Sequence, residues 1–96
     1  MISEDAVFFK WDIGNIGKNK KHTVGDEEAE EVFFDTNKKT FTDRVHSGQE
    51  KRLRLVGKTR NNRLLFVVFT MRGKDIRIIS ARDVNKKEVY LYEKTT

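Results

Sequence analysis

Three strand-like segments in a row decide the fold. They occupy residues 52–82, which read RLRLVGKTRNNRLLFVVFTMRGKDIRIISAR. The middle segment, LLFVVFTM (64–71), is continuously apolar, as is typical of a central strand covered on both faces. In the flanking segments, Leu53 and Leu55, and later Ile76 and Ile78, recur with the period of two that half-buried strands show. The links between the segments are short, so the stretch predicts an antiparallel sheet with LLFVVFTM at its centre.

Helical patterns lie on both sides of these strands. GDEEAEEVFF (25–34) carries acidic residues in its first turn, and Ala29, Val32 and Phe33 form its buried stripe. After the strands, Asn85 and Glu88 have the spacing of a capping box, which predicts a terminal helix.

The N-terminal segment is harder to interpret. VFFKW (7–11) predicts a short strand, and Asp12 can cap a helix that turns Ile13 and Ile16 toward the core. Gly14 and Gly17 weaken that helix by ~1 kcal/mol each relative to alanine. Residues 35–48 are polar and predict an irregular loop. The order is then β-α-α-β-β-β-α, an α+β class with helices packed on an antiparallel sheet, in one domain spanning 1–96.

Charge is distributed unevenly along the chain. Residues 1–48 hold 7 Lys/Arg against 10 Asp/Glu, whereas residues 49–96 hold 13 against 5. A basic half favours a polyanionic partner, with a solvated surface as the alternative. With no cysteine and only His22 and His46, far apart, the chain predicts no metal site and no cofactor. No apolar run approaches a membrane span, so we expect a soluble, cytoplasmic protein.

The chain resembles the BrnT toxin family over most of its length. The residues that carry the resemblance are Phe9-Lys10-Trp11-Asp12, Asn19 to His22 with Val24, Glu27-Glu28-Ala29, Val32-Phe33, Asp35, Asp43, His46-Ser47, Glu50, Arg52, Gly57, Arg63-Leu64-Leu65, Thr70, Ile76 to Arg82, Glu88 and Tyr92-Glu93. Two departures, Gly14 with Gly17 and the pair Gly25-Asp26, lie in the acidic half. The resemblance implies a RelE-like fold, a ribonuclease that stops translation, and a BrnA-type antitoxin that neutralises it.

Metal-independent RNA cleavage needs a base, an acid, and cations that hold the charge of the transition state. Arginine suits the last task because its planar fork binds two phosphate oxygens. Arg52 and Arg77 are the candidate catalytic cations, and a wider RNA-binding surface is expected from Arg54, Arg82, Lys51 and Arg72. The alternative for these side chains is a solvated sheet face, or pairing with Glu50, Asp75 or the antitoxin.

His46 and Glu50 could each act as the base or the acid, because both lie in or beside the polar loop and histidine titrates near neutrality. His46 could instead only order its loop. Tyr92 could stack on an RNA base or pack the terminal helix against the sheet.

Two classes of function remain open from these residues. The first is a ribonuclease toxin; the second is a non-catalytic module that binds nucleic acid or a partner through the same basic surface. We expect a hetero-oligomer in which the antitoxin covers the basic face and supplies the contact with operator DNA. The acidic residues 26–31 could alternatively dock a basic antitoxin segment.

Overall fold

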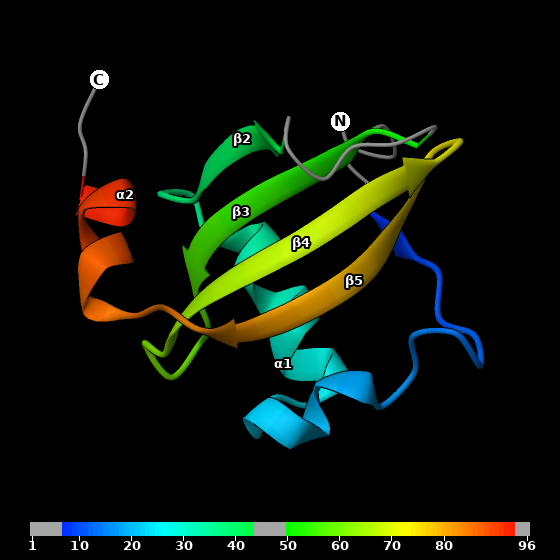
Figure 1. Ribbon diagram of the computed structural model, residues 1–96, viewed down its shortest axis with the longest axis horizontal. Helices are drawn as coiled ribbons and strands as arrows, with labels where there is room; N and C mark the ends of the chain where they lie inside the picture. Colours follow the sequence, from blue (N-terminus) through cyan, green and yellow to red (C-terminus); the bar gives the residue numbers. More distant parts are fainter. Residues whose placement is uncertain (1–6, 44–49, 94–96) are drawn as a thin grey trace.

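The computed structural model describes residues 7–43 and 50–93, which form a five-stranded mixed sheet with one helical segment (residues 26–34) behind it and a second (residues 86–93) beside one end of the strands (Figure 1). The strands are β1 (Phe8–Phe9), β2 (Lys39–Asp43), β3 (Arg52–Lys58), β4 (Leu64–Arg72) and β5 (Asp75–Asp83). The helices are α1 (Asp26–Glu31) and α2 (Val89–Glu93), with three 3₁₀ turns, η2 (Lys18–His22), η3 (Val32–Phe34) and η4 (Lys86–Glu88). The α+β class is therefore confirmed.

The three strands predicted from residues 52–82 are all present. β3 pairs antiparallel with β4, and β4 pairs antiparallel with β5, so β4 lies in the middle of the strand order β1-β5-β4-β3-β2. The backbone N–H of Thr59 donates to the carbonyl of Arg63 at 2.8 Å and closes the predicted hairpin between β3 and β4. Gly73, with φ of +64°, makes the tight turn into β5, a conformation that glycine adopts without strain.

Two strand predictions were wrong. Residues 39–43, predicted as loop, form β2, which pairs antiparallel with β3 at the sheet edge. β1 pairs parallel with β5, so the sheet is mixed rather than antiparallel. The reason is topological: the whole chain between β1 and β5 serves as the crossover that a parallel pair requires, and no local pattern reveals such a long-range partner.

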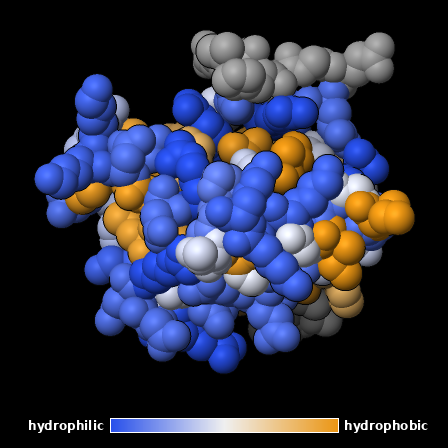
Figure 2. Space-filling view, turned by 60° about the horizontal axis from the view of Figure 1, so that its bottom comes forward, coloured by the Kyte–Doolittle hydropathy of each residue, from blue (hydrophilic) through white to orange (hydrophobic). Residues whose placement is uncertain are grey.

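The predicted helix after Asp12 was also wrong. The chain turns at residues 12–16 and continues into η2, leaving Ile13 96% and Ile16 57% exposed rather than directed into the core. Gly17 has φ of +68°, which is left-handed and incompatible with a continuous helix. Figure 2 shows hydrophobic side chains in several places on a mostly hydrophilic face, one of them the right-hand edge, where Figure 1 places the segment between β1 and η2.

The core lies between the sheet and the segment α1–η3. Ala29, Val32 and Phe33 are buried as predicted, and the Phe33 and Phe69 rings meet edge to face at 5.0 Å. Gly57 lets β3 approach η3 closely, because a Cβ at this position would lie 2.9 Å from the carbonyl oxygen of Val32. None of the helices in residues 7–43 and 50–93 is long and apolar enough to cross a membrane.

The predicted capping box at the C-terminal helix is confirmed. The Asn85 side chain accepts from the backbone N–H of Glu88, and the Glu88 carboxylate accepts from that of Asn85, both at 3.1 Å. The first turn is the 3₁₀ segment η4, which continues into α2.

Candidate functional site

The arginines of β3, β4 and β5 share the sheet face that lies opposite α1. Side chains of the core point from β4 at Leu65, Val67 and Phe69, so Phe66, Val68, Thr70 and Arg72 point the other way. Residues that pair across neighbouring strands point to the same face. On this face Arg54 pairs with Val68, Arg77 with Thr70 and Arg82 with Phe66. In Figure 1 this face is turned toward the viewer, with α1 behind the strands.

A bulge in β5 is what brings Arg77 and Arg82 together on that face. Val68 pairs with Ser80 and Phe69 with Ile78, so Ile79 is an extra residue without a partner in the β4 register. Arg77 and Arg82 are five positions apart and would point to opposite faces of a regular strand. The predicted alternation of Ile76 and Ile78 is correct, and the bulge ends it after Ile78, because Ser80 pairs with Val68 and so points to the face of the arginines.

Glu50 lies near three arginines at one end of this face. Its carboxylate accepts two hydrogen bonds from Arg72, at 2.5 Å from Nε and 3.3 Å from Nη2. The hydrogen bond from Arg72 is the main cause that holds the pKa of Glu50 below its usual value; burial opposes it, and the positive charges of Arg72, Arg77 and Arg52 add to the lowering. We call Glu50, Arg52, Arg72 and Arg77 the Glu50 cluster; it unites three of the four predicted catalytic residues.

Arg54 and Arg82 lie in a second group that is built around Phe66. The Arg82 guanidinium lies 4.5 Å from the centre of the Phe66 ring, and that of Arg54 lies 5.9 Å from the rings of both Phe66 and Phe41. Glu88 accepts from both Nη atoms of Arg82 at 2.8 Å, and this bond lowers the pKa of Glu88 more than burial raises it. These arginines cover an apolar ring, and we call Arg54, Phe66, Arg82 and Glu88 the Phe66 cluster.

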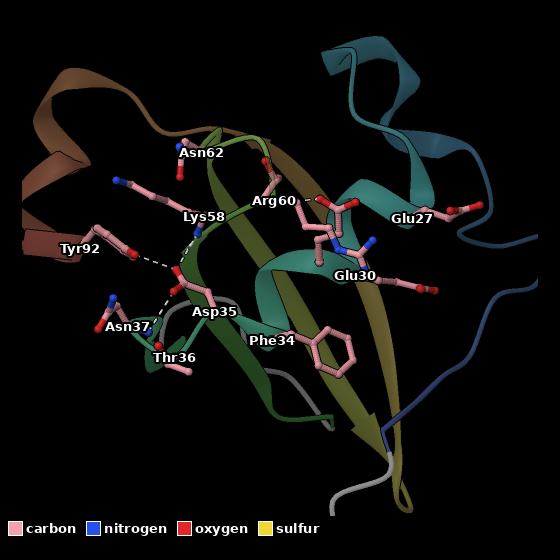
Figure 3. A pocket seen from close by; sticks show the side chains of 12 residues that line it. Glu27, Glu30, Phe34, Asp35, Thr36, Asn37, Lys58, Arg60, Asn62 and Tyr92 are labelled. Carbon is pink, nitrogen blue, oxygen red and sulfur yellow. Dashed lines mark hydrogen bonds between the residues drawn. The ribbon is translucent and has the colours of Figure 1, made fainter.

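Tyr92 lies apart from both arginine groups. Its hydroxyl donates to Asp35 at 2.7 Å, and the ammonium groups of Lys39 and Lys58 lie 5.6 and 5.5 Å from its ring centre. Burial, reinforced by the bond to Asp35, raises the pKa of Tyr92 to about 12. Figure 3 shows Tyr92 reaching from α2 toward Asp35, at the rim of a hollow of about 640 Å³ that is also lined by Glu27, Glu30 and Glu31 of α1. Its contacts are those of a residue that fastens α2, and its role in RNA binding stays a prediction.

The remaining candidates are placed as follows. Lys51 is exposed beside the Glu50 cluster, and its carbonyl accepts from the Thr70 hydroxyl at 2.8 Å. His46 lies outside the described residues. Among the described residues, no three His, Cys, Asp or Glu side chains form a group that could hold a metal ion.

Sequence reasoning missed Asp12, which pairs with Arg77 at 2.8 Å between Oδ2 and Nη1. This hydrogen bond lowers the pKa of Asp12, as does the bond from the backbone N–H of Gly14. The two residues are 65 positions apart, and a lone aspartate at a helix start gives no signal of such a distant partner.

Comparison with known proteins identifies the class. Residues 11–88 match the family model described as "Ribonuclease toxin, BrnT, of type II toxin-antitoxin system", so the class is that of ribonuclease toxins with an antitoxin partner and an RNA target. The family is BrnT, and the chain belongs to it. A search of curated proteins gave no match.

Proposed function

We propose that this chain cleaves messenger RNA at the Glu50 cluster without a metal ion, and thereby inhibits translation and growth. The observation that carries the proposal is a carboxylate that is bonded to Arg72 and lies within the electrostatic influence of Arg52 and Arg77, which point to the same sheet face. The substrate 2′-hydroxyl attacks the adjacent phosphorus, its proton passes to a base, and a 2′,3′-cyclic phosphate forms as the 5′-oxygen leaves. A base and several guanidinium groups close together are what this reaction requires.

Glu50 is assigned as the base and the arginines as the charge clamp. Arg72 keeps Glu50 ionised, the state in which a carboxylate accepts a proton. The guanidinium groups remain protonated at every physiological pH and donate to the equatorial phosphate oxygens as their charge grows. A phosphate that takes over these donors also raises the pKa of Glu50, which makes it a stronger base when substrate is bound.

His46 is assigned as the acid that protonates the leaving oxygen. A histidine with a pKa near neutrality can give up a proton at the pH of the cell. His46→Gln should lower cleavage by roughly 10²-fold, as removal of a general acid does. A pH–rate profile that is the same in parent and variant would leave His46 with a role in its loop alone.

The experiment that tests the function uses the purified chain with end-labelled RNA in the presence of EDTA. We expect cleavage that leaves cyclic phosphate ends, and a loss of roughly 10²-fold or more in Glu50→Gln. Glu27→Gln is the matched control, because it makes the same chemical change at an exposed position of α1. RNA that is retained but stays intact in all three proteins would favour the non-catalytic binding module.

We further propose that the antitoxin is of the BrnA type and that it covers the arginine face directly. The 13 Lys/Arg of residues 49–96 offer complementary charge to an acidic segment, and burial of that face also blocks RNA. The expected RelE-like character of the fold belongs to the same proposal, which rests on a sheet with α1 on one face and the arginines on the other.

A further inference from the structure

The guanidinium of Arg77 is held in place by the turn that follows β1. Its Nη1 donates to Oδ2 of Asp12 at 2.8 Å. The Arg77 side chain is only 15% exposed, whereas that of Asp12 is 44% exposed. Arg77 therefore lies against the protein surface in a defined position and does not extend freely into solvent.

Asp12 is itself oriented by the backbone of its own turn. Its second carboxylate oxygen, Oδ1, accepts from the backbone N–H of Gly14 at 2.8 Å. The Asp12 carbonyl accepts from the N–H groups of Asn15 and Ile16 at 3.0 and 2.8 Å, and its own N–H donates to the Asn15 side chain at 2.8 Å. Because both Oδ1 and the backbone of Asp12 are fixed by these hydrogen bonds, the other oxygen, Oδ2, faces Arg77 in a defined direction.

Asn15 fastens this turn to the strand that carries Arg77. Asn15 is 3% exposed, and its Nδ2 donates to the carbonyl oxygens of Ile78 and Lys10, each at 3.0 Å. Ile78 directly follows Arg77 in β5. The turn therefore contacts β5 at two adjacent residues: Asn15 binds the backbone carbonyl of Ile78, and Asp12 binds the side chain of Arg77.

Gly14 completes the arrangement. A Cβ built at position 14 would lie 2.5 Å from Nη2 of Arg77, so the missing side chain leaves the space that the guanidinium occupies. Gly14 was expected to weaken a helix; in the folded chain it accommodates the arginine instead.

We propose that Asp12 is a positioning residue, which with its turn fixes the Arg77 guanidinium for contact with an RNA phosphate. The proposal rests on the function proposed above. The guanidinium has five N–H donors, and the ion pair with Asp12 uses one of them. The other N–H groups can still donate to phosphate oxygens. Positioning matters because a displacement of ~1 Å in a reacting or stabilising group costs up to 10²-fold in rate.

The test is Asp12→Asn, which keeps an oxygen for the Gly14 N–H but removes the charge that holds Arg77. Asp83→Asn is the matched control, since Asp83 also pairs with an arginine, through Nε of Arg63 at 2.7 Å, on the core side of the sheet. Both variants raise the net charge by one, so any non-specific gain in RNA affinity is common to both. Each is assayed for cleavage of RNA, and for affinity to a 2′-O-methyl RNA that cannot be cleaved, at a temperature where melting curves show both folded.

We expect Asp12→Asn to lose roughly tenfold or more in kcat/KM and to bind the uncleavable RNA more weakly than Asp83→Asn. In an Arg77→Lys background, Asp12→Asn should have little further effect, because it acts through Arg77. Equal behaviour of the two Asn variants, or full additivity with Arg77→Lys, would overturn the proposal. If the parent chain binds RNA without cutting it, the proposed catalytic function is wrong, and the positioning role of Asp12 is then decided by the RNA affinities of the two variants. A parent that neither binds nor cuts would overturn both.

Discussion

The ion pair between Glu88 and Arg82 gives a stability prediction that can be worked from its geometry. Glu88→Gln removes the charge from two hydrogen bonds of 2.8 Å to Arg82, and it disturbs the bond from the Asn85 N–H at 3.1 Å. The Glu88 side chain is 19% and that of Arg82 37% exposed, so the pair is neither buried nor fully solvated. Exposed pairs contribute about 0.2–1 kcal/mol and hydrogen bonds to charged groups about 1.5–3 kcal/mol. Because solvent reaches Arg82, we expect a loss of about 1–2 kcal/mol.

Urea unfolding followed by circular dichroism measures this loss. The midpoint should fall while the slope m stays constant, because the surface exposed on unfolding is unchanged. Glu93→Gln is the control; Glu93 is an exposed residue at the end of α2, and its substitution should change stability by no more than about 0.5 kcal/mol. If Glu88→Gln is no less stable than Glu93→Gln, the view that Glu88 holds Arg82 over Phe66 is wrong.

The same pair predicts a pH dependence. The pKa of Glu88 is lowered below its usual value of 4.5, chiefly by Arg82, so the folded chain binds the proton more weakly than the unfolded chain does. The contribution of Glu88 to stability is therefore fully present above pH 4.5, and it is lost as the pH falls through the lowered pKa. The difference in stability between parent and Glu88→Gln should shrink in acid, and a difference that stays constant down to pH 2 would contradict the assignment.

Three further predictions concern other parts of the chain. Gly14→Ala should raise the pKa of Asp12, measured by carbon NMR of its carboxyl group, because the new methyl group displaces Arg77; Gly25→Ala, which meets no atom within 4 Å, should leave that pKa unchanged. The parent should lose stability from pH 10 toward pH 12 because the pKa of Tyr92 is raised from 10.0 to about 12, and Tyr92→Phe should lose less over that interval in alkaline melting curves. Hydrogen exchange of the antitoxin complex should show protection in β3, β4 and β5, whereas protection confined to α1 and η3 would contradict direct cover of the arginine face.

The sequence predicted those elements whose stability is local or depends on neighbouring segments. β3, β4 and β5 follow one another with short links, so each finds its partner next to it in the chain. The stripe on α1 and the capping box at Asn85 depend on spacings within one or two turns. β2 could have been found from the alternation Lys-Thr-Phe-Thr-Asp, but its polar composition resembles that of an irregular loop.

The candidate site was predicted by residue type but not by arrangement. Arg52, Arg77 and Glu50 were chosen for their chemistry, and the structure brings them together with Arg72. The sequence placed Arg72 in the same wider set as Arg82, whereas the structure puts Arg72 on Glu50 and Arg82 over Phe66. That difference depends on which side chains lie opposite each other in the sheet, and register is a property of paired strands.

By itself, the sequence determined the α+β class, the three antiparallel strands with β4 at their centre, the basic second half and the resemblance to the BrnT family, because these depend on composition, periodicity and residues close together in the chain. Only the tertiary structure decided that β1 runs parallel to β5, that a bulge at Ile79 turns Arg77 and Arg82 to one face, and that Asp12 holds Arg77 across 65 positions. Each of these is a contact between distant segments. Such contacts form because the folded chain must pair the backbone groups of its strands and pair its partly buried charges. The local sequence patterns are compatible with several ways of doing so, and they do not say which one the chain adopts.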